Sequence, residues 1–140
     1  MCGIVGITAN VSVSSNIIGA LKKLEYRGYD SAGIAINTES QIHQKKAKGK
    51  LDNLILSLQK DGFDGKVGIG HTRWATHGEP SERNAHPHSS RKVSLVHNGI
   101  IENASELKSR AELKNYNFES DTDSEVITAL ITHYLNEGHD

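Results

Sequence analysis

The sequence predicts an α+β domain in which a mostly antiparallel sheet packs against amphipathic helices. Apolar runs with strand character and apolar repeats with helical spacing both occur, but they do not alternate regularly, which argues against a doubly wound parallel sheet. The 140 residues suffice for one domain, and the 36% hydrophobic and 24% charged residues are ordinary for a globular protein. We therefore expect one layered domain with a hydrophobic core.

The first part of the chain contains the patterns of a helix and several strands. Residues 2–7 form an apolar run with two glycines, which predicts a strand that begins at the chain's only cysteine. Ser14 or Ser15 is expected to cap a helix whose apolar residues share one face. Residues 32–36 predict a second strand, and residues 41–46 predict a more polar third strand or sheet edge.

The central part adds a helix, a strand and a long loop. Apolar residues repeat at helical spacing over residues 50–59, and a turn rich in glycine and aspartate follows at residues 61–65. Residues 67–71 alternate larger side chains with glycine and predict a strand. Residues 77–90 are polar, contain both prolines and predict a long loop of the kind that often has a function. A strand over residues 93–96 leads into an Asn-Gly turn.

Two capping-box patterns mark the starts of the last two expected helices. Asn103 with Glu106 predicts a helix that extends to about residue 114. Thr122 with Glu125 predicts the start of the final helix, and Gly138 is suited to its C-terminal cap. We find no internal repeat and no linker, so all these elements are expected to belong to one domain.

Cys2 is the strongest candidate for chemistry because it directly follows Met1. Initiator methionine is readily removed before a small residue, and its removal would leave a thiol and a free α-amine on one residue. Only the thiolate attacks a carbonyl, and an α-amine with a reference pKa near ~8 can accept the thiol proton. This pattern suggests an N-terminal cysteine nucleophile. The alternative is a small, inert cysteine buried in the first strand.

Further polar residues stand at the ends of expected strands or in loops. Asn98 and Gly99 offer a side-chain amide and a backbone N–H that can stabilise an oxyanion, although the pair is also typical of an ordinary hairpin turn. Arg73 can clamp a carboxylate and Asp123 can pair with an ammonium group, or each can be a plain ion-pair or helix-terminal residue. Trp74, the only tryptophan, is either part of the core or a mobile cover over a site.

Composition and motifs argue against several other functions. A net charge of −1 gives no reason to expect a nucleic-acid or membrane partner. Five of the eight histidines lie between His71 and His97, but no H-E-x-x-H occurs, so we expect no metal site. The glycines of residues 65–70 lack the phosphate-loop order and indicate close strand packing instead. One cysteine, no signal peptide and no apolar run of ~20 residues predict a cytoplasmic protein.

Six blocks of the sequence resemble the glutaminase domain of the glutamine–fructose-6-phosphate aminotransferase (isomerizing) family, also called glucosamine-6-phosphate synthases, which are class II glutamine amidotransferases. The blocks are CGIVG (2–6), YRGYDSAG (26–33), HTRWATHGEP (71–80), NAHPH (84–88), HNGIIEN (97–103) and SDTDSE (120–125). Their order and length make the resemblance specific, and it spans essentially the whole chain. It implies the N-terminal-nucleophile hydrolase fold, an αββα sandwich of mostly antiparallel sheets, with L-glutamine as nitrogen donor and no cofactor.

The resemblance also implies a role for each matching site residue. It implies that Cys2 is the nucleophile with its own α-amine as base, and that Asn98 and the Gly99 N–H form the oxyanion hole. It implies that Arg73 binds the α-carboxylate of glutamine and that Asp123 binds the α-ammonium. The residues that it assigns to the pocket lining, to the loop that closes the pocket and to the support of the N-terminus are Thr76, His77, Trp74, Arg27 and Gly28.

The departure from the family is chain length. Family members continue beyond Asp140 and then carry sugar isomerase domains, so residues 1–140 are expected to form the N-terminal part of a type 2 glutamine amidotransferase domain, with an incomplete sandwich and without sugar isomerase domains. Fructose 6-phosphate is expected only through that missing part, and full-length members are expected to be homo-oligomers. The alternatives are an amidophosphoribosyltransferase-type glutaminase domain and an inactive interaction module that kept the motif residues.

Overall fold

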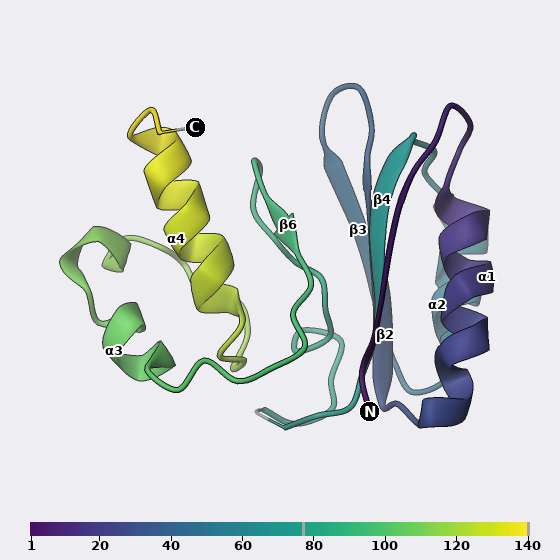
Figure 1. Cartoon of the computed structure of the whole chain (residues 1–140), viewed down its shortest axis with the longest axis horizontal. Helices are drawn as coiled ribbons and strands as arrows, with labels where there is room; N and C mark the ends of the chain where they lie inside the picture. Colours follow the sequence, from purple (N-terminus) through teal and green to yellow (C-terminus); the bar gives the residue numbers. More distant parts are fainter. Residues whose placement is uncertain (77, 140) are drawn as a thin grey trace.

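The main sheet of the protein is antiparallel throughout. The computed structural model describes residues 1–76 and 78–139. Its four-stranded sheet has the order β1-β4-β2-β3 (Figure 1). These strands are β1 (Gly3–Thr8), β2 (Ser31–Asn37), β3 (Ile42–Lys48) and β4 (Val67–Arg73). The antiparallel sheet predicted from the sequence is confirmed, with each strand close to its expected range.

Two helices, α1 (Ser14–Leu24) and α2 (Leu51–Lys60), cover one face of this sheet (Figure 1). One stripe of each helix is buried, as the repeats predict, and Ile17 and Leu21 of α1 are fully inaccessible. Burying such a side chain contributes roughly 1.5–3 kcal/mol, so these stripes fix the helices on the sheet. A Cβ at Gly70 would lie 2.5 Å from Cγ2 of Ile17, so this glycine of β4 permits the predicted close packing.

The short helix η1 (Glu25–Arg27) continues α1 and belongs to the same part of the fold. The remaining elements form a second, smaller part: β5 (His88–Ser89), β6 (Ser94–Leu95), α3 (Ala104–Lys108), η2 (Ala111–Leu113) and α4 (Glu125–Asn136). Strands β5 and β6 pair antiparallel and lie between the main sheet and α4 (Figure 1). The layers therefore follow the helix, sheet, sheet, helix order that the resemblance implies. No helix among the described residues is long and apolar enough to cross a membrane.

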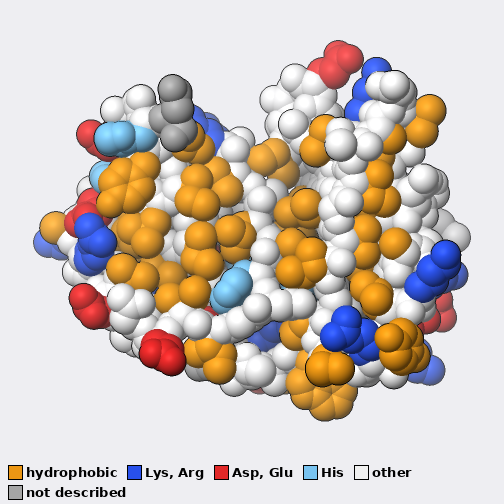
Figure 2. All heavy atoms as spheres, in the orientation of Figure 1, with side chains coloured by type: hydrophobic (Ala, Val, Ile, Leu, Met, Phe, Trp, Pro, Cys, Tyr) orange, Lys and Arg blue, Asp and Glu red, His pale blue; other side chains and the backbone are white. Residues whose placement is uncertain are grey.

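The second layer leaves part of the main sheet uncovered. Among the described residues its sheet has only the two short strands β5 and β6, so the sandwich is not closed. Ile4 and Val67, which lie on the sheet face opposite α1 and α2, are 45% and 47% exposed. In Figure 2 hydrophobic side chains gather over both layers on the face toward the viewer. The incomplete sandwich expected from the sequence is thus observed in the described residues.

The helix predicted from Asn103 to about residue 114 is wrong as a single element. It is divided into α3 and η2, and the Asn103 side chain makes no capping hydrogen bond. The hydroxyl of Ser109 donates to the Glu106 carbonyl at 2.7 Å and ends α3, and Arg110 is extended. This break brings Leu113 against the core of α4, where it is only 1% exposed. Tertiary packing therefore prevails over the local helical pattern.

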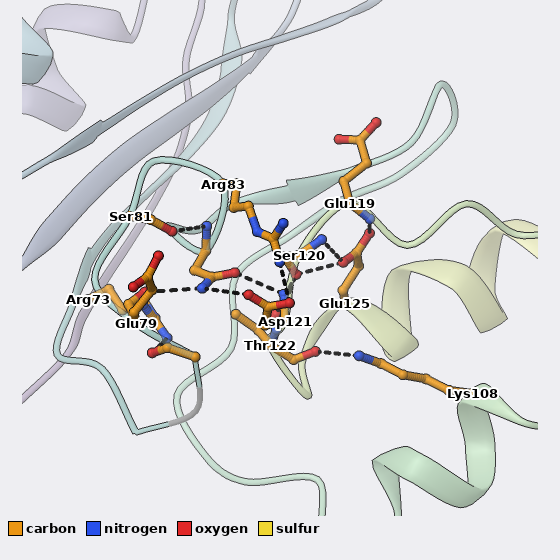
Figure 3. A network of polar contacts seen from close by, with 12 residues as sticks. Arg73, Glu79, Ser81, Arg83, Lys108, Glu119, Ser120, Asp121, Thr122 and Glu125 are labelled. Atoms are coloured by element: carbon orange, nitrogen blue, oxygen red, sulfur yellow. Dashed lines mark hydrogen bonds and ion pairs between the residues drawn. The ribbon is translucent and has the colours of Figure 1, made fainter.

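The capping box predicted at Thr122 and Glu125 is also wrong. The N-cap of α4 is Ser124, without a side-chain capping bond. The Glu125 carboxylate instead accepts hydrogen bonds from the Ser120 backbone N–H at 2.7 Å and the Ser120 hydroxyl at 2.6 Å, as Figure 3 shows. Glu125 therefore holds the loop before the helix. The predicted cap at Gly138 is confirmed, because its φ is +88° and the next N–H reaches back to Tyr134 at 3.1 Å.

At the start of α1 the predicted serine cap is replaced by a contact with another loop. The N-cap residue is Val13, and it makes no side-chain hydrogen bond to the helix. The Ser14 hydroxyl donates to the Phe63 carbonyl at 2.7 Å. This bond ties the start of α1 to the loop between α2 and β4, a contact that local sequence cannot predict.

Candidate active site

An open cleft of about 440 Å³ lies at the start of β1. Three segments that are far apart in the sequence line this cleft. They are the N-terminus together with η1, the residues that follow β4, and the residues that follow β6. The antiparallel register of β1 and β4 places Gly3 opposite Thr72, so Cys2 lies beside the end of β4. The residues that line the cleft are Met1, Cys2, Arg27, Trp74, Thr76, Asn98 and Gly99.

The sulfur of Cys2 is held by the backbone of Trp74. The Trp74 N–H donates to Sγ at 3.1 Å, and the thiol lies 3.5 Å from the Trp74 carbonyl oxygen. Cys2 is only half-buried, so its sulfur is not the inert core thiol of the alternative interpretation. In this chain Met1 precedes Cys2, and the Met1 amine donates to the Arg27 carbonyl at 2.9 Å. Arg27 therefore lies where the resemblance places it, next to the N-terminus.

Asn98 and Gly99 face the same cleft as the sulfur. The side-chain oxygen Oδ1 of Asn98 is 2.7 Å from Nε2 of His71, a buried residue of β4. A Cβ at Gly99 would lie 2.7 Å from Nε2 of His97, so only glycine fits there with this histidine orientation. The Asn-Gly pair therefore lines the cleft, and it does not connect two paired strands among the described residues, so the hairpin-turn alternative is not observed.

Trp74 lies on the surface and is not part of the core. Its side chain is 53% exposed, and its ring packs on Gly28, where a Cβ would approach ring carbon Cζ3 to 3.0 Å. Gly28 has φ +76°, a conformation that glycine adopts easily. The core interpretation of Trp74 is therefore wrong, and its role in closing the pocket stays a prediction.

Two predicted substrate-binding residues do not line the cleft. Arg73 is 4% exposed, and its guanidinium donates to the carbonyls of Gly78 at 3.2 Å and Glu79 at 3.3 Å. Asp123 is 8% exposed, and its carboxylate accepts the Ile101 N–H at 2.6 Å. Both side chains thus shape loops beside the cleft, and their contacts with glutamine stay predictions.

The remaining predicted lining residues lie on the segment after β4. Thr76 lines the cleft. His77 lies outside the described residues, so its predicted role stays untested. The loop that follows is fixed by polar contacts: Arg83 forms an ion pair with Asp121, and the Asn84 side chain accepts the Asp121 N–H at 2.9 Å (Figure 3).

Asp30 is a site-supporting residue that sequence reasoning missed. Its carboxylate accepts the Ala75 N–H at 2.5 Å, and its own N–H donates to the Arg73 carbonyl at 2.7 Å. These bonds hold the segment that carries Trp74 and Thr76 next to the cysteine. Two signals pointed to its neighbourhood, the polar cluster over residues 27–30 and the family-like block that contains it, but neither gave Asp30 a role of its own.

Three of the histidines form a buried stack behind the cleft. The rings of His71 and His86 stack with centroids 4.4 Å apart, and His88 lies edge-on to His86 at 4.4 Å. Neither ring nitrogen of His86 has a hydrogen-bond partner among the described residues. No group of three metal-ligating side chains is found in the described part of the chain. These histidines therefore form a packed aromatic cluster.

Burial keeps these histidines neutral. Desolvation lowers the pKa of His71 from 6.5 to about 4 and that of His88 to about 3, and it also lowers the pKa of His86. The positive charge of Arg73 acts in the same direction on all three pKa values. The folded state therefore binds fewer protons than the unfolded state below pH 6.5.

We expect the free energy of unfolding to fall as the pH drops from about 6.5 toward 4, because unfolding lets these rings take up protons. The loss should be on the order of 3 kcal/mol for one such histidine. Urea unfolding at several pH values measures it. His86→Leu should make the pH dependence shallower, whereas His139→Gln, at an exposed position, should leave it unchanged. A free energy of unfolding that stays constant over this range would contradict the prediction.

A family model and full-length relatives both relate this chain to glutamine amidotransferases. The family model described as "Glutamine amidotransferase domain" matches residues 58–139. The chain is 51% identical to the glutamine–fructose-6-phosphate aminotransferase (isomerizing) of Brucella suis and 52% identical to that of Clostridium acetobutylicum. Each alignment covers 99% of this chain but 23% of the relative, so the chain spans about a quarter of the length of these relatives.

Solved structures resemble the fold as well. The glutamine phosphoribosylpyrophosphate amidotransferase of Bacillus subtilis, complexed with ADP and GMP, superposes with a TM-score of 0.76 at 27% identity, over 94% of this chain and 29% of that one. A second structure, described as the allosteric regulatory enzyme of purine biosynthesis, gives a TM-score of 0.75 at 28% identity, over the same shares of the two chains. The layered arrangement of this chain is therefore that of known amidotransferases.

Proposed function

Because the chain belongs to the glutamine amidotransferase domain family, we propose that it hydrolyses L-glutamine to glutamate and ammonia, with Cys2 as the nucleophile. One observation supports this proposal above all. The fold brings Cys2, Asn98 and Gly99 into a single cleft, although Asn98 lies 96 residues after Cys2 in the sequence. A thiol beside two oxyanion donors is the arrangement that acyl transfer requires.

The proposed reaction has two steps. The Cys2 thiolate attacks the side-chain amide carbon of glutamine, and the oxygen of the tetrahedral intermediate accepts hydrogen bonds from the Asn98 side-chain NH2 and the Gly99 N–H. The amide nitrogen takes a proton and leaves as ammonia, which leaves a γ-glutamyl thioester on Cys2. Water then attacks the thioester and releases glutamate and the thiol. In both steps the α-amine of Cys2, once Met1 is removed, relays the proton.

Arg73 and Asp123 complete the proposal as the residues that recognise the α-carboxylate and the α-ammonium of glutamine. Both charged groups are already present in the substrate, so their contacts contribute to binding rather than to the chemical step. In the structure both side chains are engaged by backbone groups, so these roles require that glutamine compete with those contacts. Thr76, His77 and Trp74 are proposed to line and cover the bound glutamine.

In a longer protein the ammonia would be used for a synthesis. By similarity to the curated relatives we propose conversion of fructose 6-phosphate to glucosamine 6-phosphate, in a part of the protein beyond residue 140. An amidophosphoribosyltransferase-type domain is supported less well, since those structures are 27–28% identical to this chain, against 51% for the sugar enzyme. A cytoplasmic location and a homo-oligomeric full-length protein stay predictions.

A glutaminase assay combined with mass spectrometry of the N-terminus tests the proposal. We expect the fraction of the purified chain that begins at Cys2 to release glutamate from glutamine, and the fraction that keeps Met1 to be inactive, since its Cys2 nitrogen is an amide. Full activity with Met1 in place would refute the amine as base. Absence of hydrolysis by the processed chain would refute the proposed function and favour the inactive interaction module.

A further inference from the structure

His71 lies directly behind the proposed oxyanion donor. It belongs to β4, its side chain is completely buried, and it does not line the cleft. Its ring nitrogen Nε2 is 2.7 Å from Oδ1 of Asn98, which is exposed at the cleft. A group that is shielded from the cleft in this way acts on the reaction only through the residue that it contacts.

The protonation of this contact follows from its chemistry. The Asn98 oxygen is an acceptor only, so a hydrogen bond at this distance requires the hydrogen on Nε2. The contact with Asn98 therefore places the single proton of a neutral ring on Nε2, and a hydrogen bond with the His97 backbone also acts on the ring by raising its pKa. Burial lowers the pKa of His71 to about 4, so the neutral ring is the form present near pH 7.

We propose that His71 is a positioning residue, which donates from Nε2 to Oδ1 of Asn98 and thereby turns the Asn98 NH2 group toward the reacting carbonyl. The inference rests on the proposed glutaminase function. In the flipped amide, the NH2 group would face the Nε2–H as a second donor, and the amide oxygen would face the developing oxyanion. Both contacts are repulsive, so the His71 hydrogen bond selects the productive orientation of the amide.

The surrounding histidines hold the His71 ring in this orientation. His86 stacks on it with an interplanar angle of 29°, and His88 packs edge-on against His86. The Nε2 of His88 in turn pairs with the Thr122 hydroxyl at 2.8 Å. The donor behind Asn98 is therefore fixed before glutamine binds, as an effective oxyanion site requires.

Substitution of His71 tests its effect on catalysis. His71→Leu should lower kcat for glutamine by roughly 10–100-fold, less than the loss expected when the oxyanion donor itself is removed. KM should change little, because the Asn98 NH2 group stabilises negative charge that develops on the substrate oxygen only at the transition state. His71→Gln, which can place an amide N–H where Nε2–H lies, should recover most of the rate. His43→Gln, on β3 away from the cleft, is the matched control and should leave kcat unchanged.

A double-mutant cycle separates positioning from a general structural effect. In an Asn98→Ala background, His71→Leu should cause no further loss of kcat, because its effect passes through Asn98. Loss of kcat by the same factor in both backgrounds would overturn the proposal, and so would wild-type kcat in His71→Leu.

A spectroscopic measurement on the unaltered chain decides the contact even if the His71 variants do not fold. Nitrogen-15 NMR of labelled histidine should find His71 neutral and protonated at Nε2, with a slowly exchanging ring proton. Protonation at Nδ1 would overturn the proposal. Failure of the unaltered, processed chain to hydrolyse glutamine would instead refute the proposed function, while the NMR result would still decide the orientation of the Asn98 amide.

Discussion

Replacing Cys2 with alanine is expected to abolish glutamine hydrolysis in the chain that begins at residue 2. The thiol is the only group on the cleft wall suited to form the thioester, since Cys2 is the chain's only cysteine. Loss of a covalent nucleophile costs on the order of 10⁶ in kcat in a serine protease, and we expect a similar loss here. The variant should therefore release ammonia at about a millionth of the rate of the unaltered chain, which is below detection in an enzyme-coupled assay.

The Cys2→Ala variant should still fold and bind substrate. The substitution removes a half-buried sulfur and the hydrogen bond that it accepts from the Trp74 N–H at 3.1 Å. We therefore expect only a small change in the free energy of unfolding. Thermal unfolding and calorimetric titration with glutamine provide the controls. Measurable hydrolysis by a folded Cys2→Ala variant would exclude Cys2 as the nucleophile.

Replacing Asn98 with alanine should lower kcat by roughly 10²–10³, the usual cost of removing one oxyanion donor. KM for glutamine should change little, because the substrate carbonyl carries far less negative charge than the tetrahedral oxyanion. Asn98→Asp keeps the size of the side chain but replaces the donor with a negative acceptor, so its kcat should be at least as low. Steady-state kinetics over a range of glutamine concentrations measures both effects.

Asn103→Ala is the matched control for the asparagine variants. Asn103 is exposed on the same loop and makes no capping hydrogen bond with its side chain, so its loss should leave kcat and the free energy of unfolding unchanged. An unchanged turnover in Asn98→Ala would remove Asn98 from the oxyanion hole. It would also remove the reason for the proposed role of His71.

Local sequence patterns predicted helices and strands well where burial of one face produces a regular spacing of apolar residues. The α1 and α2 stripes and the alternation along β4 are periodic, and each periodicity follows from burial of one face against the sheet. The two capping boxes failed for a different reason. The Glu125 carboxylate accepts a hydrogen bond from the Ser120 backbone N–H instead of capping its own helix. The Ser109 hydroxyl bonds to the Glu106 carbonyl, and α3 ends there. Such side-chain choices depend on the loops that tertiary folding brings near.

The candidate site could be predicted in part. The position of Cys2 after Met1 and the Asn98-Gly99 pair indicated acyl chemistry without any structure. The residues also pointed to Arg73 and Asp123, and the resemblance assigned them to the two α-groups of glutamine, yet neither lines the cleft in the described structure. Their side chains are engaged by nearby backbone groups. The roles of both residues therefore depend on how the loops respond to glutamine.

The sequence by itself determined the helical faces, the antiparallel sheet class and the family, and it indicated Cys2 as the candidate nucleophile. Only the tertiary structure decided that the Cys2 sulfur meets Trp74, 72 residues away, and that His71 supports Asn98, 27 residues away. The physical reason is the range of the forces involved. Side-chain periodicity and backbone preference act within a few residues, whereas a cleft forms where strand register brings distant segments together, and the register is fixed by burial over the whole sheet.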